Sequence, residues 1–169
     1  PDQLPDLDKL HAPPVLQSIC REQHGLVLVT GATGSGKSTT LAAMVDSINT
    51  AQARHILTIE DPIEFVHQPQ KSLINQREVA RHTHNFAAAL RAARREDPDV
   101  ILIGELRDPE TIRLALSAAE TGHLVLATLH TNTAAQSIHR LVDVFPAGEK
   151  SLVRNQLATA LRAVIAQSL

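Results

Sequence analysis

Four short apolar runs limit this chain to one class of fold. They occupy residues 25–30, 56–59, 100–103 and 124–127. Each run is nearly continuous, whereas a strand with one face in water alternates apolar and polar side chains. Strands of this kind are buried on both faces, and here the segments between them have helical spacing. The sequence therefore predicts an α/β fold, with a mainly parallel sheet flanked by helices.

Helices are predicted between and after these runs. Apolar residues recur at intervals of three and four after Asn85, after Asp108 and through the last twenty or so residues, as far as Ile165. Asp108 is a suitable N-cap, and Gly122 suits the position that ends the same helix. Residues 63–75 predict a small β-hairpin around a Gln-Pro-Gln turn.

Composition argues against several classes of protein. The 169 residues suffice for one domain, and a formal net charge of -2 gives no electrostatic reason to expect nucleic acid or a membrane surface. Aromatic residues make up only 2% of the chain, too few for base stacking along a single strand. The lone cysteine, Cys20, is expected in the core. No apolar run approaches the roughly 20 residues that span a bilayer, so no membrane insertion is expected.

A phosphate-binding motif follows the first apolar run directly. Residues 31–38 read GATGSGKS and match the pattern GxxxxGK[ST] between a strand and a helix. The glycines let backbone N–H groups surround phosphate oxygens, and the helix N-terminus adds partial positive charge. Lys37 is expected to reach the β- and γ-phosphates of ATP, and the Ser38 hydroxyl to bind Mg²⁺. The predicted nucleotide-binding residues here are Gly31, Thr33, Gly34, Ser35, Gly36, Lys37, Ser38 and Thr39.

Three predicted catalytic residues follow the other apolar runs, at the sheet edge where parallel sheets bind ligands. They are Glu60, Glu105 and His130. Glu105 is predicted to polarise the attacking water, although an ion pair with Arg107 or Arg113 would also explain it. Glu60 is expected to assist Mg²⁺ binding through a water. His130 is expected to sense the γ-phosphate or to position Glu105.

Taken as a set, four segments resemble the signatures of the type II/IV secretion and type IV pilus ATPase superfamily. In chain order, GLVLVTGATGSGKSTT resembles its Walker A motif, ILTIEDPIE its Asp box, DPDVILIGELRD its Walker B motif and TGHLVLATLHTN its His box. Three further stretches resemble the pilus retraction (PilT-like) enzymes within it. These are DPIEFVHQ with INQREV, ETIRLALSAAETGHL, and RLVDVFPAGEKSLVRNQL.

The resemblance implies a RecA-like P-loop NTPase core that hydrolyses ATP with Mg²⁺. It implies a homo-oligomer, a hexameric ring, that drives pilus retraction and twitching motility. Its place would be the cytoplasm, at the inner-membrane base of the pilus beside a platform protein. By motif, Glu60 belongs to the Asp box, Glu105 is the catalytic carboxylate, and His123 and His130 belong to the His box, with His123 among the nucleotide-binding residues.

The same resemblance suggests a domain division. Members of the family carry an N-terminal PAS-like domain, which completes the nucleotide site, and helices that follow the core. Residues 1–14, rich in Pro and Asp, are therefore expected to be the linker from that N-terminal domain. Residues 15–169 are expected to be the ATPase core, without the C-terminal helices of the family.

Other functions stay open at this point. A related secretion or pilus assembly ATPase would share the four signatures. A nucleotide-binding subunit that does not hydrolyse ATP would keep the phosphate loop, although an intact Lys37, Ser38 and Glu105 argue against it. A RecA-like translocase would need nucleic acid, which the composition disfavours.

Overall fold

The structure, a computed structural model, describes residues 4–32, 34–79 and 83–167. Within these ranges six strands form one sheet in the order β3-β2-β4-β5-β1-β6, and every neighbouring pair is parallel. The predicted α/β fold with a mainly parallel sheet is therefore confirmed. The strands are β1 (Gly25–Thr30), β2 (His55–Glu60), β3 (Leu73–Glu78), β4 (Val100–Ile103), β5 (Leu124–Leu129) and β6 (Leu161–Ala166).

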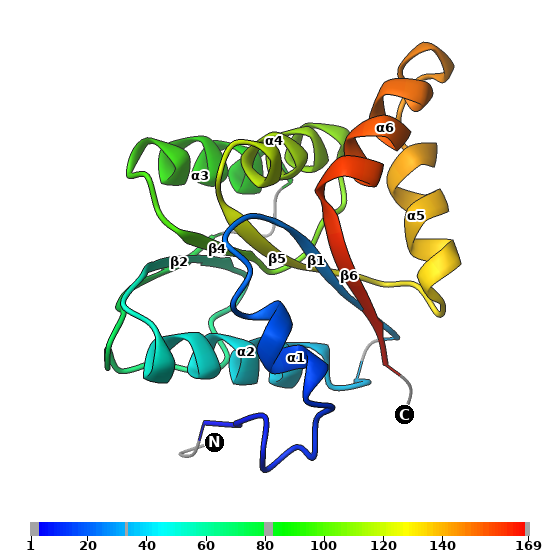
Figure 1. Ribbon diagram of the computed structural model, residues 1–169. Coiled ribbons are helices and arrows are strands. Elements are labelled where there is room, and N and C mark those ends of the chain that lie inside the picture. Colours follow the sequence, from blue (N-terminus) through cyan, green and yellow to red (C-terminus); the bar gives the residue numbers. More distant parts are fainter. Residues whose placement is uncertain (1–3, 33, 80–82, 168–169) are drawn as a thin grey trace.

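Helices cover both faces of the sheet (Figure 1). One face carries α1 (Val15–Ile19) and α2 (Lys37–Ala51). The other carries α3 (Thr83–Arg95), α4 (Pro109–Glu120) and α6 (Lys150–Ala160), and α5 (Ala134–Asp143) packs beside α6 and β6. A short 3-10 helix, Ala147–Glu149, joins α5 to α6. None of the helices in the described ranges is long and apolar enough to cross a membrane.

The continuous apolar runs are explained by two separate core clusters. In β1, Leu26 and Leu28 join the cluster on the side of α3, α4 and α6, whereas Val27 and Val29 join the cluster on the side of α2. Successive side chains of a strand point to opposite faces, so a sheet covered on both faces needs apolar residues at every position. Cys20 is fully buried in the second cluster, as expected.

Two of the helix boundaries agree with the capping residues in the sequence. The Asp108 side chain accepts a hydrogen bond from the backbone amide of Thr111 at 3.1 Å, which caps the N-terminus of α4. Gly122 follows the other end of α4 with a φ of 109°, in the left-handed region where glycine has no steric penalty.

The predicted hairpin over residues 63–75 is wrong. Residues 61–72 contain no strand, and β3 pairs in parallel with β2 at the edge of the main sheet. The pattern was misleading because β3 is a half-exposed edge strand rich in polar residues, and neither polarity nor alternation distinguishes a parallel from an antiparallel neighbour.

The predicted final helix is too long. Helix α6 ends at Ala160, and the next residues, Leu161–Ala166, form strand β6 beside β1. The run LRAVIA suits a helix or a strand equally well by periodicity, so pairing with β1 decided its conformation.

The division of the chain at residue 14 stays a prediction. The described part of the expected linker is not wholly exposed, because Leu7 is buried with the cluster on the α2 side.

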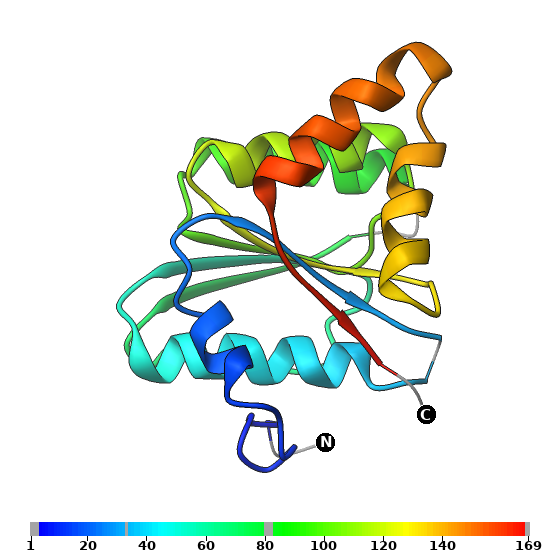
Figure 2. The same cartoon turned by 45° about the vertical axis from the view of Figure 1, so that its right-hand side comes forward.

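Because every neighbouring pair of strands is parallel, the six strands end at the same edge of the sheet, and the amino end of α2 lies at that edge too (Figure 2). The functional residues expected from the sequence therefore have one place to meet.

Candidate functional site

A cleft of about 500 Å³ opens at the carboxyl edge of the sheet. It is lined by residues that come from four separate parts of the chain. The phosphate loop and α2 contribute Gly34, Gly36, Lys37, Ser38 and Thr39; β2 and its loop contribute Glu60 and Glu64; and the ends of β4 and β5 contribute Gly104, Glu105, Thr128 and His130. The fold thus brings together most of the residues that the sequence singled out.

The phosphate loop has the backbone geometry that its glycines were expected to allow. Gly34 and Gly36 have φ angles of 83° and 94°, which side-chain-bearing residues rarely adopt. Helix α2 begins at Lys37, so the unpaired N–H groups of its first turn face the cleft. Gly31 and Ser35 belong to the loop but do not line the cleft. Thr33 lies outside the described residues.

Gly31 is required for a different reason. A Cβ atom at this position would come within 2.7 Å of the Gln167 carbonyl oxygen and would also meet the Ser35 side chain. The start of the loop is therefore pressed against the chain that leaves β6. A larger residue at position 31 would displace one of the two segments.

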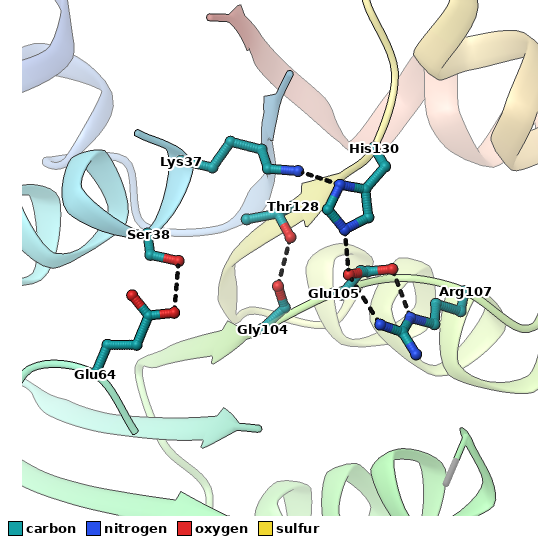
Figure 3. Close-up of polar contacts among 8 residues, drawn as sticks. All are labelled: Lys37, Ser38, Glu64, Gly104, Glu105, Arg107, Thr128 and His130. Atoms are coloured by element: carbon teal, nitrogen blue, oxygen red, sulfur yellow. Dashed lines mark hydrogen bonds and ion pairs between the residues drawn. The ribbon is translucent and has the colours of Figure 1, made fainter. Parts of the chain in front are cut away.

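A continuous chain of contacts joins the phosphate loop to the end of β4 (Figure 3). Lys37 Nζ lies 2.6 Å from His130 Nδ1, and His130 Nε2 lies 2.7 Å from Glu105 Oε1. When Lys37 is protonated it has only donors, so Nδ1 must accept and the ring proton must be on Nε2, where it is donated to Glu105. Burial lowers the pKa of Lys37, and the nearby Glu105 carboxylate opposes that shift.

Arg107 holds the other side of the Glu105 carboxylate. Its Nε donates to Glu105 Oε2 at 2.5 Å and its Nη2 to Oε1 at 3.3 Å. Burial raises the pKa of Glu105, but the hydrogen bonds from Arg107 and His130, together with the charge of Arg107, outweigh burial and leave that pKa below the usual value. Glu105 is thus kept ionised, with an ion pair to Arg107 and a contact to His130 at once. Arg113 pairs with Glu149 instead.

Thr128 forms hydrogen bonds with the residues on both sides of Glu105. Its hydroxyl donates to the carbonyl oxygen of Gly104, and its own carbonyl oxygen accepts from the backbone amide of Leu106 at 3.1 Å. Thr128 is itself buried in β5. The position of Glu105 is therefore determined by the neighbouring strand as well as by its own.

Two carboxylates approach the phosphate loop from the β2 side. Glu60 Oε2 accepts from Thr58 Oγ1 at 2.6 Å and from Gln76 Nε2 at 3.1 Å. Burial raises the pKa of Glu60, although these two hydrogen bonds favour the ionised form. Glu64 Oε1 accepts from Ser38 Oγ at 3.3 Å, which places a second carboxylate at the predicted metal ligand.

The donor set fits Mg²⁺. Ser38, Glu60 and Glu64 offer oxygen atoms to one cleft, and Mg²⁺ prefers oxygen ligands. Within the described residues, no group of three or more His, Cys, Asp or Glu side chains could hold a metal ion by itself. Mg²⁺ in nucleotide sites uses one or two protein ligands with phosphates and waters, so a sparse set of this kind is sufficient.

His123 lies apart from the other predicted site residues. It directly precedes β5, at the amino edge of the sheet, whereas the cleft is at the carboxyl edge. It is buried, and its Nδ1 lies 2.6 Å from the carbonyl oxygen of Pro98. Within one chain the geometry gives His123 a structural contact and no access to the cleft.

Several residues of the site have weak signals in the sequence. Glu64 is the last residue of the segment that resembles the Asp box and also lies in the stretch DPIEFVHQ, but neither resemblance singled it out as a site residue. Gln76 lies in the stretch INQREV, which resembles the retraction enzymes but does not indicate what the side chain contacts. Only the parallel pairing of β3 with β2 brings it to Glu60. Such contacts depend on strand register, which the sequence did not specify.

The arrangement is suited to chemistry on a phosphoanhydride. It combines backbone donors and a lysine for phosphate oxygens, oxygen ligands for Mg²⁺, and an ionised carboxylate held by His130 and Arg107. Phosphoryl transfer depends on positioning and charge stabilisation of this kind.

Known proteins resemble this chain over its whole length. The sequence profile described as "Type II/IV secretion system protein" matches residues 8–169. A "Twitching motility protein" of Neisseria gonorrhoeae is 64% identical over 169 residues, which are 100% of this chain and 45% of that protein. The "Type IV pilus retractation ATPase PilT" of Pseudomonas aeruginosa is 60% identical over 169 residues, which are 100% of this chain and 49% of that protein.

A solved structure agrees with the sequence comparison. The "Pilus Retraction Motor PilT and Bound ADP" matches with a TM-score of 0.92 and 55% identity, over 97% of this chain and 48% of that chain. The chain thus spans about half the length of these proteins.

Proposed function

The chain belongs to the type II/IV secretion system protein family, and we propose that it is the ATP-hydrolysing core of a type IV pilus retraction motor. The observation that carries this proposal is the chain of contacts from Lys37 through His130 to Glu105, beside a phosphate loop. The identity of 60% to a pilus retraction ATPase and of 64% to a twitching motility protein supports the choice of retraction.

Nucleotide binding rests on the phosphate loop and Lys37. The backbone N–H groups at the start of α2 and the Lys37 ammonium bind the phosphates. Lys37 has to exchange its contact with His130 for a phosphate oxygen when ATP enters. That exchange removes the donor to His130 Nδ1, while Nε2 of the same ring still contacts Glu105. His130 therefore links nucleotide occupancy to Glu105.

Hydrolysis rests on Glu105. Its carboxylate orients a water and accepts the proton that the water loses as its oxygen attacks the γ-phosphorus and ADP leaves. Thr128 and Arg107 keep the carboxylate in place, and the Arg107 ion pair keeps it ionised. Ser38 would hold Mg²⁺, with Glu60 assisting directly or through a water. The ion, when bound, neutralises developing charge on the phosphates.

Assembly is the third part of the proposal. The chain works as a homo-oligomer, a hexameric ring, in which a neighbouring subunit completes the nucleotide site. Its place is the cytoplasm, at the inner-membrane base of the pilus, where it acts with a platform protein. The names of the two relatives support a role in twitching motility and pilus retraction, and the composition of the chain offers nothing that favours a nucleic-acid partner.

The test is Mg²⁺-dependent ATP turnover measured against protein concentration. Lys37→Ala and Glu105→Gln remove the proposed phosphate and water contacts. Glu120→Gln, at the exposed end of α4, is the matched control for a lost carboxylate. Turnover that rises faster than linearly and disappears in both site variants supports a motor whose site is completed between subunits. Strictly linear turnover contradicts the ring.

Two alternatives give different results. Nucleotide binding with no turnover at any concentration favours a non-hydrolysing subunit. A secretion or pilus assembly ATPase is distinguished by a chimera, in which residues 8–169 replace the matching segment of the Neisseria gonorrhoeae relative. Restored twitching supports retraction, whereas an active ATPase without twitching favours the other motors.

A further inference from the structure

A half-buried amide on the edge strand contacts both Glu60 and the loop that follows β2. Gln76 lies in β3, and its Nε2 donates both to Glu60 Oε2 at 3.1 Å and to the carbonyl oxygen of Phe65 at 2.8 Å. Its Oε1 accepts from the backbone amide of His67 at 2.9 Å. A glutamine side chain has two N–H donors, so both are used here. The amide is therefore held in one orientation.

These contacts also orient the Glu60 carboxylate. The last torsion of a glutamate side chain is soft, so hydrogen bonds decide where each oxygen points. Thr58 and Gln76 both donate to Oε2, at 2.6 and 3.1 Å. Among the described residues none forms a hydrogen bond to Oε1, and Glu60 lines the cleft. The arrangement leaves Oε1 available to a ligand there.

The same amide fixes the loop that carries Glu64. Phe65 is the next residue after Glu64, and its carbonyl oxygen is the second acceptor of Gln76. Glu64 in turn accepts the hydrogen bond of Ser38 at 3.3 Å. A shift of the Phe65 peptide would therefore move Glu64 relative to the phosphate loop.

General anchoring of this loop does not depend on Gln76. Asn49 of α2 accepts at Oδ1 from the amides of Gln70 and Ser72, at 2.8 and 3.4 Å, and donates from Nδ2 to the carbonyl oxygen of Gln68 at 2.8 Å. Asn49 thus holds the half of the loop that leads into β3. Gln76 holds the half that borders the cleft.

We propose that Gln76 is a positioning residue of the hydrolytic site, which orients Glu60 and the adjoining loop toward the bound nucleotide. The inference rests on the proposed function, because it assigns Gln76 a role in the ATPase reaction of this cleft. Gln76 acts through Glu60 and need not contact the nucleotide.

The test is a double-mutant cycle in the full chain. Gln76→Met removes the hydrogen bonds at similar length, Glu60→Ala removes the carboxylate, and the double variant combines them. Gln76→Glu keeps the acceptor for the His67 amide and serves if the methionine variant does not fold. Gln70→Met, an exposed residue of the same loop, is the matched control. Turnover gives kcat and KM, and a fluorescent ADP analogue gives Kd with Mg²⁺ and with EDTA.

The expected result is a fall in kcat of about tenfold in Gln76→Met, with KM and the Kd in EDTA changed by less than about twofold, an effect typical of a misplaced site group. The gain in ADP affinity that Mg²⁺ provides should also shrink. In the Glu60→Ala background, Gln76→Met should change neither quantity further, because additivity fails for groups that act together.

Two outcomes would overturn the inference. One is a folded Gln76→Met variant with the kcat and the Mg²⁺ effect of Gln70→Met. The other is a Gln76→Met effect of equal size with and without Glu60, as expected if Gln76 merely anchors the loop. If the parent chain has no turnover, the proposed function fails instead, and the Mg²⁺ effect on ADP binding alone decides the role of Gln76.

Discussion

Replacing Thr128 by valine would remove one hydroxyl and keep the shape of a buried, β-branched strand residue. The hydroxyl donates to the Gly104 carbonyl oxygen, next to Glu105. Leaving a buried acceptor unpaired costs about 1–3 kcal/mol. Because Gly104 is half-exposed and water can reach it, the lower part of that range, about 1–2 kcal/mol, applies here. For a chain of this size the melting temperature should fall by about 2–8 °C.

The effect on turnover should be larger than the effect on stability. A site group displaced by about 1 Å can lose up to about a hundredfold in rate, so we expect Thr128→Val to lower kcat by about ten- to a hundredfold. Thr128→Ser is the matched control, because it keeps the hydroxyl and removes a methyl group worth about 0.8 kcal/mol or somewhat more in a packed site. The two variants should then melt at similar temperatures but differ in kcat. Equal kcat values in Thr128→Val and Thr128→Ser would show that the Thr128 hydroxyl does not hold Glu105 in its active position.

Three further predictions follow from the structure. Burial lowers the pKa of His67 below its ordinary 6.5. The unfolded chain therefore takes up a proton at His67 more readily than the folded chain, and the free energy of unfolding falls as the pH drops below about 6.5. The melting temperature of His67→Gln should accordingly fall by fewer degrees between pH 7.5 and 5.5 than that of the parent. Burial raises the pKa of Cys20 to about 12, so the native thiol should resist iodoacetamide at pH 8 and react only as fast as the chain unfolds. Asp108→Ala removes the N-cap of α4 and should cost about 0.5–2 kcal/mol in urea unfolding, whereas Asp108→Asn should cost less.

Each of these has an outcome that contradicts it. If the melting temperature of His67→Gln fell as steeply toward pH 5.5 as that of the parent, groups other than His67 would cause the acid sensitivity. Rapid alkylation of Cys20 under native conditions would contradict its burial. Equal loss in Asp108→Ala and Asp108→Asn would mean that the hydrogen bond to Thr111 is not the source of the effect.

Much of the fold was predictable from local patterns. The apolar runs predicted four of the strands because a doubly covered sheet demands apolar side chains at every position. The phosphate loop was predictable because its glycines, Lys37 and Ser38 lie within eight residues, and strand and helix flank them. Glu60, Glu105 and His130 could be named because a parallel sheet carries the residues at its strand ends to one edge.

The rest was decided by pairing between distant parts of the chain. The run LRAVIA becomes a strand only because β1 offers it an open edge, and β3 is parallel rather than a hairpin partner because it joins β2. Local periodicity carries no information about which strand is the neighbour. His123 shows the same limit, since its motif suggests the site but its place before β5 puts it at the far edge.

The class of fold, the phosphate loop and the residue types at the strand ends follow from the amino-acid sequence alone, because they depend on spacing within short segments. The folded chain was needed to show that His130 bridges Lys37 and Glu105, that Arg107 and Thr128 hold Glu105, and that Gln76 reaches Glu60. Those contacts depend on strand order and register, and these are set by the packing of the whole domain.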